Sequence, residues 1–307
     1  MAEKKGKSDE SPFVPCLQSR RCRCAAVKTA PAQTAQPEAV LPGAAPLYPF
    51  SDPDFGFSNL IALGNSRYGV GVPGKLLALT SKIKSGDFES AWTAYRLAGQ
   101  ESLALAQSAV KKRHNVSARE AYLAAASYFS GAPRFGDSTD NPERMLACWQ
   151  DYALCWAAAA ELFDPPIERL EIPYEGTSLT GWFLRVDNSR RRKPLVIIHN
   201  GADGLEVNSY VLGAAGALAR GYNCLIFNGP GQGDSLWVRK LYFRPDWEKV
   251  ITPVVDAMLL RREVDPKRIA LVGISQGVTG QRARWPSNTA SQPGSPIPAR
   301  GMFQNPG

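Results

Sequence analysis

Apolar residues recur at helical spacing between residues 72 and 164, which predicts a region built from helices alone. The first helix is expected around residues 76–83. The second begins after Asp87, which suits an N-cap, and continues towards Lys111, with a break expected near Gly99. The region therefore starts with two helices that can pack against each other through their apolar faces.

Two further helices are expected in the same region. The third has Ser117 as N-cap and Glu120 three residues later, the pattern of a capping box, and it ends near Gly131. The fourth has Pro142 in its first turn and runs to Phe163. The aromatic residues on these helices are expected to fill a core rather than to surround a cofactor.

The apolar pattern changes from helical to strand-like spacing after Asp164. A hairpin comes first, and three buried strands separated by helices follow it. The strands are expected at residues 167–174, 179–186, 194–199, 222–227 and 268–273, and the helices at about 206–220 and 245–262. Strands that alternate with helices of this length predict an α/β fold with a mostly parallel sheet and right-handed crossovers.

The two ends of the chain show neither pattern. Residues 1–46 are rich in alanine, proline, lysine and glutamine and hold too little apolar area to offset the entropy of ordering. Residues 278–307 contain five prolines and no acidic residue. We therefore expect a disordered tail over 1–46, an all-α cap over 47–164, an α/β core over 165–277 and a second disordered tail over 278–307.

The positive charge of the chain lies at these ends. The formal net charge is +8, of which residues 1–46 carry +3 and residues 266–307 carry +5, so residues 47–265 are neutral. A nucleic-acid-binding protein should carry its basic excess on the folded part, which argues against nucleic acid as a partner. Neither a membrane span nor an apolar leader is visible, so we expect a cytoplasmic protein that binds a small-molecule substrate and no membrane. A homodimer is left open.

The six cysteines give no sign of a metal site. Cys148, Cys155 and Cys224 lie at apolar helix and strand positions, where we expect buried, reduced thiols. The three cysteines within residues 16–24 fit no zinc-ligand spacing well and have no histidine near them. We therefore expect neither a metal nor a cofactor.

The strongest chemical motif is Gly273-Ile274-Ser275-Gln276-Gly277, a G-x-S-x-G that follows the last expected strand directly. In such a motif the chain turns sharply from strand to helix, which lifts the serine hydroxyl above the sheet, and the glycines relieve crowding with neighbouring backbone. Ser275 is therefore the candidate catalytic nucleophile. The alternative is a glycine-rich strand end without a catalytic role.

A carbonyl oxygen that becomes negative during attack needs backbone N–H donors. Gln276, the residue after the nucleophile, is one candidate donor, and Ala202 in the loop after the first parallel strand is the other. Asp203 in that loop is expected to shape the loop rather than to catalyse. The glycine-rich segment 229–234 lacks the G-x-G-x-x-G spacing, and no helix is expected directly after it, so it does not predict a dinucleotide site.

Four fragments together resemble a known family. They are NGADG at 200–204, FNGPGQG at 227–233, FRPDWE at 243–248 and GISQG at 273–277. They resemble α/β-hydrolases with an N-terminal helical cap, the group of 2,6-dihydroxypseudooxynicotine hydrolase, FrsA-like esterases and fungal hydrolases that trim polyketides in pigment and mycotoxin pathways. The resemblance covers residues 47–277. It implies a serine nucleophile at Ser275, an oxyanion hole at Ala202 and Gln276, cap helices over the active site, and cleavage of an ester or of a C–C bond beside a ketone.

The chain departs from this family after Ser275. In α/β-hydrolases the catalytic acid and histidine follow the nucleophile along the chain. Here no acidic residue follows Asp265, and the two histidines, His114 and His199, both precede Ser275. The resemblance places His199 beside the oxyanion hole, and His114 is expected to be solvated. No catalytic acid or base is therefore identified.

Our hypothesis for the departure is a frameshift, or a gene-model error with that effect. Relatives that this chain resembles continue the motif as Gly-Gly-Tyr-Trp, which GGN GGT TAC TGG can encode. Loss of one G gives GGN GTT ACT GG, which encodes Gly-Val-Thr-Gly, the sequence at 277–280. We therefore expect a hydrolase truncated after its nucleophile, inactive as written, with Ser275 at the open edge of an incomplete sheet.

Two other functions stay open. The helices of residues 72–164 could form a non-catalytic interaction module, but no period relates them to one another as in a repeat protein. A pseudoenzyme that binds the family's ligand would need a complete pocket, which the absent strands argue against.

Overall fold

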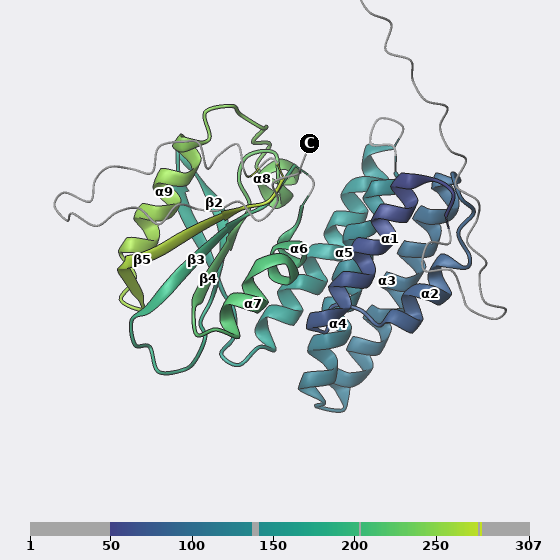
Figure 1. The fold of residues 1–307 in the computed structure, drawn as a ribbon, viewed down its shortest axis with the longest axis horizontal. Coiled ribbons are helices and arrows are strands. Elements are labelled where there is room, and N and C mark those ends of the chain that lie inside the picture. Colours follow the sequence, from purple (N-terminus) through teal and green to yellow (C-terminus); the bar gives the residue numbers. More distant parts are fainter. Residues whose placement is uncertain (1–49, 137–140, 203, 276, 278–307) are drawn as a thin grey trace, which may run out of the picture. The chain divides into compact units, whose positions relative to one another are not determined.

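A computed structural model describes residues 50–136, 141–202, 204–275 and 277 (Figure 1). The two expected disordered tails, residues 1–46 and 278–307, lie outside the described residues. The structure confirms an α/β fold in which a helical region precedes a mostly parallel sheet. No helix within the described ranges is long and apolar enough to cross a membrane.

The cap consists of long helices joined by short connections (Figure 1). Its helices are α1 (Pro53–Asn65), α2 (Pro73–Thr80), α3 (Phe88–Lys111), α4 (Asn115–Gly131) and α5 (Pro142–Glu161), with 3-10 turns η1 (Ser66–Tyr68) and η2 (Ala132–Phe135). The carboxylate of Asp87 accepts the N–H of Ser90 at 3.0 Å, which confirms Asp87 as the N-cap of α3. Pro142 is the first residue of α5, and α4 ends at Gly131, both as expected.

Three expectations about the cap are wrong. Helix α3 continues through Gly99 without a break. Helix α4 begins three residues earlier than expected, with His114 instead of Ser117 at the N-cap, so Ser117 lies inside its first turn and forms no capping box. Helix α1 was not expected at all, although its start has a clear local signal. The carboxylate of Asp52 accepts the N–H groups of Asp54 and Phe55 just before the helix.

Gly99 permits close packing of α3 against α4. A Cβ atom added at Gly99 would lie 2.6 Å from the ring of Phe129 on α4. That ring is 1% exposed, so it has no free space into which it could move. The glycine that sequence reasoning treated as a break is therefore a contact position inside an intact helix.

The core contains five described strands, β1 (Glu168–Tyr174), β2 (Thr177–Leu184), β3 (Lys193–His199), β4 (Asn223–Phe227) and β5 (Val264–Gly273). Their order in the sheet is β1-β2-β4-β3-β5. The β1–β2 hairpin and β2–β4 are antiparallel, and β3 pairs parallel with β4 and with β5. Within the described residues Ser275 therefore follows a strand at one edge of the sheet.

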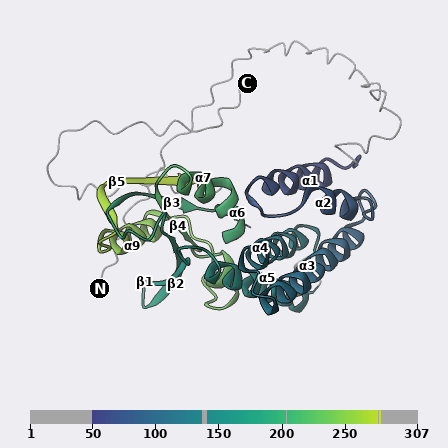
Figure 2. The ribbon, with the colours of Figure 1, turned by 90° about the horizontal axis from the view of Figure 1, so that it is seen from below.

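The helices of the core cover both faces of this sheet (Figures 1 and 2). They are α6 (Glu206–Ser209), the π-helical turn η3 (Tyr210–Ala214), α7 (Ala215–Leu218), α8 (Gly233–Trp237) and α9 (Glu248–Leu259). The helix expected over 206–220 is thus α6, η3 and α7 in succession. Alternation along the strands explains the two layers, since Ile198 and Ile226 pack on the side of α6–α7, whereas Ile197 and Leu225 pack on the side of α9.

The cap and the sheet share one apolar core. Trp156 of α5 meets Trp182 of β2 edge-on, with 5.8 Å between the ring centroids. The cluster that contains both rings extends from α1 through the cap to Ile198 and Ile226 of the sheet. The cap therefore buries apolar surface against the α/β core as well as within itself.

We predict that Gly99→Ala destabilises the chain and that Gly74→Ala does not. At Gly99 the added methyl group collides with Phe129, and overpacking costs about 1–3 kcal/mol. This exceeds the helix-propensity gain of at most about 1 kcal/mol. Gly74, in α2, has no atom within 4 Å of an added Cβ, so only the propensity gain remains. Urea unfolding of both variants checks the prediction, and equal midpoints would contradict it.

Candidate active site

The candidate nucleophile Ser275 has a left-handed backbone. Its φ is 54°, and it is exposed, two residues beyond the end of β5. Non-glycine residues avoid this region because Cβ crowds the backbone there, at about 1–3 kcal/mol. The N–H of Ile274 donates to the carbonyl oxygen of His199 at 3.0 Å, and the N–H of Gly277 donates to that of Ile274 at 2.9 Å. These bonds tie the turn at Ser275 to the end of β3.

Two glycines allow the ends of β3 and β5 to approach closely around Ser275. A Cβ atom added at Gly201 would lie 2.9 Å from the Cβ of Ser275 and 3.2 Å from the carbonyl oxygen of Ile274. A Cβ atom added at Gly277 would lie 2.7 Å from Nδ1 and 2.8 Å from the carbonyl oxygen of His199. Side chains at either position would push the turn away from the loop after β3.

The loop after β3 carries the first candidate oxyanion donor. Ala202 is exposed and directly follows Gly201, the residue that lies against Ser275. The second candidate donor, Gln276, lies outside the described residues, as does Asp203. The structure therefore brings the loop of Ala202 next to Ser275.

The buried Gln232 links this loop to the next one along the sheet. Its Nε2 donates to the carbonyl oxygens of Asn200 at 2.9 Å and Gly201 at 2.5 Å, and its Oε1 accepts the N–H of Gly229 at 2.9 Å. Sequence reasoning missed Gln232 because the segment 229–234 showed only glycine-rich loop character. It also expected no helix directly after this segment, and the short helix α8 begins at Gly233.

The two histidines occupy different environments. His199 is 1% exposed, and its ring stacks on that of Phe227. The ring of Trp247 also contacts it in a tilted arrangement, with 4.7 Å between the ring centroids. Burial lowers the pKa of His199 to about 4, so this imidazole is neutral at neutral pH. His114 is exposed at the start of α4 in the cap.

A buried carboxyl group, that of Glu206, joins the cap to the site loops. Glu206, the first residue of α6, is 6% exposed. It accepts hydrogen bonds from Tyr152 of α5 at 2.6 Å, from Trp182 of β2 at 3.2 Å and from Asn228 after β4 at 2.7 Å. The Tyr152 hydroxyl also accepts the N–H of Val207 at 3.1 Å. Burial is the main reason that the pKa of Glu206 is raised.

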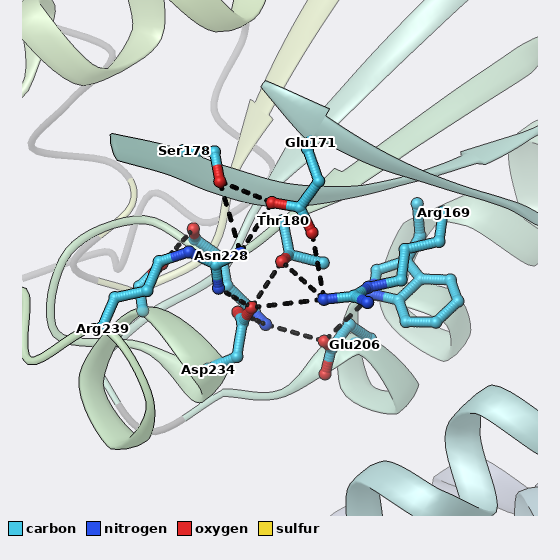
Figure 3. A network of polar contacts seen from close by, with 10 residues as sticks. Arg169, Glu171, Ser178, Thr180, Glu206, Asn228, Asp234 and Arg239 are labelled. Atoms are coloured by element: carbon cyan, nitrogen blue, oxygen red, sulfur yellow. Dashed lines mark hydrogen bonds and ion pairs between the residues drawn. The ribbon is translucent and has the colours of Figure 1, made fainter. Parts of the chain in front are cut away.

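The network extends from Asn228 to a second carboxylate (Figure 3). The amide of Asn228 donates to Asp234 at 3.3 Å. Asp234 also accepts hydrogen bonds from Thr180 of β2 and from Arg239, and Arg239 reaches Glu171 of β1 at 2.6 Å. These bonds fix the segment 228–239 to the β1–β2 hairpin. No sequence motif predicted the roles of Glu206 and Asp234, because most of their partners come from distant parts of the chain.

The described residues hold no group of three or more histidine, cysteine, aspartate or glutamate side chains that could bind a metal ion. Cys148, Cys155 and Cys224 are buried and unpaired in the structure, in line with the expectation of reduced thiols. Burial raises the pKa of Cys155 and of Cys224 to about 12, so these thiols stay protonated and unreactive at neutral pH.

Comparison with known proteins finds hydrolases. The chain is 34% identical over 231 residues to hydrolase LUC6 from a Fusarium species, covering 73% of this chain and 55% of that protein. It is 33% identical over 236 residues to 20-hydroxy-prefusarin hydrolase FUS2 from Gibberella moniliformis, with 74% and 56% covered. It is also 32% identical over 242 residues to α/β-hydrolase gkaG from Penicillium citrinum, with 75% and 56% covered.

The fold is similar to that of a solved hydrolase. The crystal structure of 2,6-dihydroxy-pseudo-oxynicotine hydrolase matches with a TM-score of 0.59 at 22% identity, over 70% of this chain and 58% of that one. No protein-family model matches the chain. The chain spans little more than half the length of the curated relatives that it matches.

We predict that Glu206 makes the stability of the chain fall as pH rises. Because its pKa is raised above the ordinary value of 4.5, the folded state keeps a proton that the unfolded chain has already lost. The contribution of Glu206 to stability is thus largest below pH 4.5 and is lost as pH rises through the folded pKa, by up to about 1.4 kcal/mol per pH unit. Glu206→Gln removes this component. Urea unfolding between pH 4 and 8 measures it.

The matched control is Glu161→Gln, which changes an exposed glutamate at the end of α5. This variant should keep the pH dependence of the unaltered chain. Parallel stability curves for the unaltered chain and Glu206→Gln would show that Glu206 titrates alike in the folded and unfolded states.

Proposed function

The chain belongs by fold and by sequence similarity to the α/β-hydrolases, and on that basis we propose that it derives from a serine hydrolase with Ser275 as nucleophile. The observation that carries the proposal is the backbone of Ser275. Ser275 has a left-handed backbone two residues after a parallel strand and lies against Gly201. This is the conformation of a strand-to-helix turn that lifts a nucleophilic serine above the sheet, and it supports the proposal together with the G-x-S-x-G motif.

The proposed reaction is acyl transfer to Ser275. Its Oγ attacks the carbonyl carbon of an ester, or of a ketone next to the C–C bond to be cleaved, while a base removes the hydroxyl proton. The electron pair of the carbonyl moves to its oxygen, which the N–H groups of Ala202 and Gln276 stabilise. When the C=O bond reforms, the alcohol or carbon fragment leaves and takes up a proton. Water then releases the acid from Ser275.

Neither histidine of the chain suits the role of the base. His199 is a poor candidate because its ring is buried against Phe227 and Trp247 and burial holds its pKa at about 4. His114 lies exposed on the cap. We therefore expect the 307-residue chain to retain at most the catalysis that an oxyanion hole gives without a triad, about 10³–10⁴-fold over water in the best-studied case.

We attribute this state to a reading frame that shifts after Gly277. The segment 277–280 reads Gly-Val-Thr-Gly, which one lost base produces from Gly-Gly-Tyr-Trp, and no acidic residue follows Asp265. In the unshifted frame the catalytic acid and histidine would follow Ser275, the order that α/β-hydrolases use.

The substrate class that we propose is a secondary metabolite, such as a polyketide with an ester or ketone. One relative is named for the hydrolysis of 20-hydroxy-prefusarin.

The alternative of a free-standing helical interaction module is less well supported. The cap shares its apolar core with the sheet, and Tyr152 of α5 bonds to Glu206 of α6. Separation of residues 47–164 from the rest would expose this surface to water.

Sequencing of the genomic DNA and the transcript over codons 270–290 tests the frame. We expect that one added base after codon 277 opens a frame that encodes a later acid and histidine. The protein from that frame should hydrolyse p-nitrophenyl esters, and Ser275→Ala should lower its kcat by about 10³-fold or more. Ser81→Ala, a change at the exposed end of α2, serves as the control and should have no effect.

Two results would overturn the proposal. A coding sequence without any hydrolase-like frame downstream would remove the case for a shifted frame. An esterase activity that survives Ser275→Ala unchanged would remove Ser275 from the mechanism.

A further inference from the structure

The side-chain amide of Gln232 forms hydrogen bonds to two loops. It is 1% exposed and directly precedes α8. Its single oxygen accepts the N–H of Gly229, in its own loop, and its NH₂ group donates to two successive carbonyl oxygens, those of Asn200 and Gly201. A primary amide has two N–H bonds, so both donors face the loop after β3.

The bond to Gly201 fixes the direction of a neighbouring N–H. In a trans peptide the C=O and the N–H point to opposite sides. The carbonyl of Gly201 and the N–H of Ala202 belong to the same peptide. Because Gln232 holds that carbonyl towards the protein interior, the N–H of Ala202 must point away from Gln232, on the side where Ala202 is exposed.

The neighbouring N–H in this loop is already engaged. The N–H of Gly201 donates to Oδ1 of Asn200 at 3.0 Å, and the amide of Asn200 donates in turn to the carbonyl of Leu205 at 2.8 Å. The N–H of Ala202 donates to no residue that the structure describes. Of the N–H groups of Gly201 and Ala202, that of Ala202 is therefore the one available to a ligand.

We propose that Gln232 is a positioning residue of the oxyanion hole. Its amide holds the Gly201–Ala202 peptide so that the Ala202 N–H faces the substrate oxygen. This inference rests on the proposed function, since it assumes that Ala202 is an oxyanion donor. Gln232 itself touches no reacting atom. Without its amide, two buried carbonyl oxygens would lose their donor, and the peptide could rotate to find another. Gly201, which has no Cβ, offers little resistance to such a rotation.

A first test uses the unaltered 307-residue chain. Amide hydrogen exchange followed by NMR should show a protected N–H at Gly201 and a rapidly exchanging N–H at Ala202. A protected Ala202 N–H with a rapidly exchanging Gly201 N–H would mean that the peptide points the other way, and the proposal would fall. This measurement depends neither on activity nor on a variant that folds.

A second test compares crystal structures of two variants with the unaltered chain. Gln232→Met keeps the length of the side chain and removes every hydrogen bond. Gln232→Glu keeps the acceptor for the Gly229 N–H but turns an oxygen towards the two carbonyls. In both variants we expect the Gly201 carbonyl to leave its position and the Ala202 N–H to turn. An unchanged peptide in both variants would overturn the proposal.

Ser235→Ala is the matched control for these variants. Ser235 is fully buried in the same segment, and its hydroxyl donates to the carbonyl of Asn228 at 2.9 Å, away from the loop of Ala202. This change should lower stability without moving the Gly201–Ala202 peptide. A shift of that peptide in Ser235→Ala as large as in Gln232→Met would reduce Gln232 to a general structural role.

Hydrolysis of p-nitrophenyl acetate separates this proposal from the one on which it rests. The assay uses the protein from the unshifted frame, in which loss of one oxyanion donor should lower kcat by about 10²–10³-fold while KM changes much less. If the peptide turns in Gln232→Met and the rate of hydrolysis stays the same, Gln232 positions the peptide but Ala202 is not an oxyanion donor. If the peptide keeps its orientation, the positioning role fails, whatever the activity of Ser275.

Discussion

The described site depends on the close approach of the chain after β5 to the chain after β3. The two segments meet so tightly that neither Gly201 nor Gly277 could carry a Cβ atom without a collision. The left-handed turn at Ser275 lies between these contacts, and the bond from Ile274 to the carbonyl of His199 holds it there. A conformation that costs about 1–3 kcal/mol persists only when its surroundings leave no alternative, and here the neighbouring backbone provides that constraint.

Buried polar side chains next to these segments, Gln232 and Glu206, support this arrangement and connect it to the cap. Gln232 fixes the carbonyls of the loop after β3, and Glu206 connects the start of α6 with Tyr152 of the cap and with Asn228. Each of these buried groups bonds to partners on several elements, so the loss of one member leaves the others unsatisfied. The loops around Ser275 are thus held by the sheet, by each other and by the cap at once.

The similarity to known hydrolases extends over most of the chain. The relatives match over about three quarters of this chain, and the solved hydrolase matches 70% of it. A base and an acid are the groups that the proposed chemistry still requires, because a serine hydroxyl is a weak nucleophile until its proton is removed.

The sequence by itself predicted most of the helices and strands, the parallel pairing of the buried strands and a turn at Ser275, because the spacing of apolar residues and glycines is a local property of the chain. It misjudged Gly99, since a glycine that weakens an isolated helix becomes favourable where Phe129 packs against it. Only the tertiary structure decided the roles of Glu206 and Gln232. The partners of Glu206 lie 22 to 54 residues away in the chain. Those of Gln232 lie 31 to 32 residues away, except for the nearby Gly229 N–H. Only packing of the cap, sheet and loops brings these groups together.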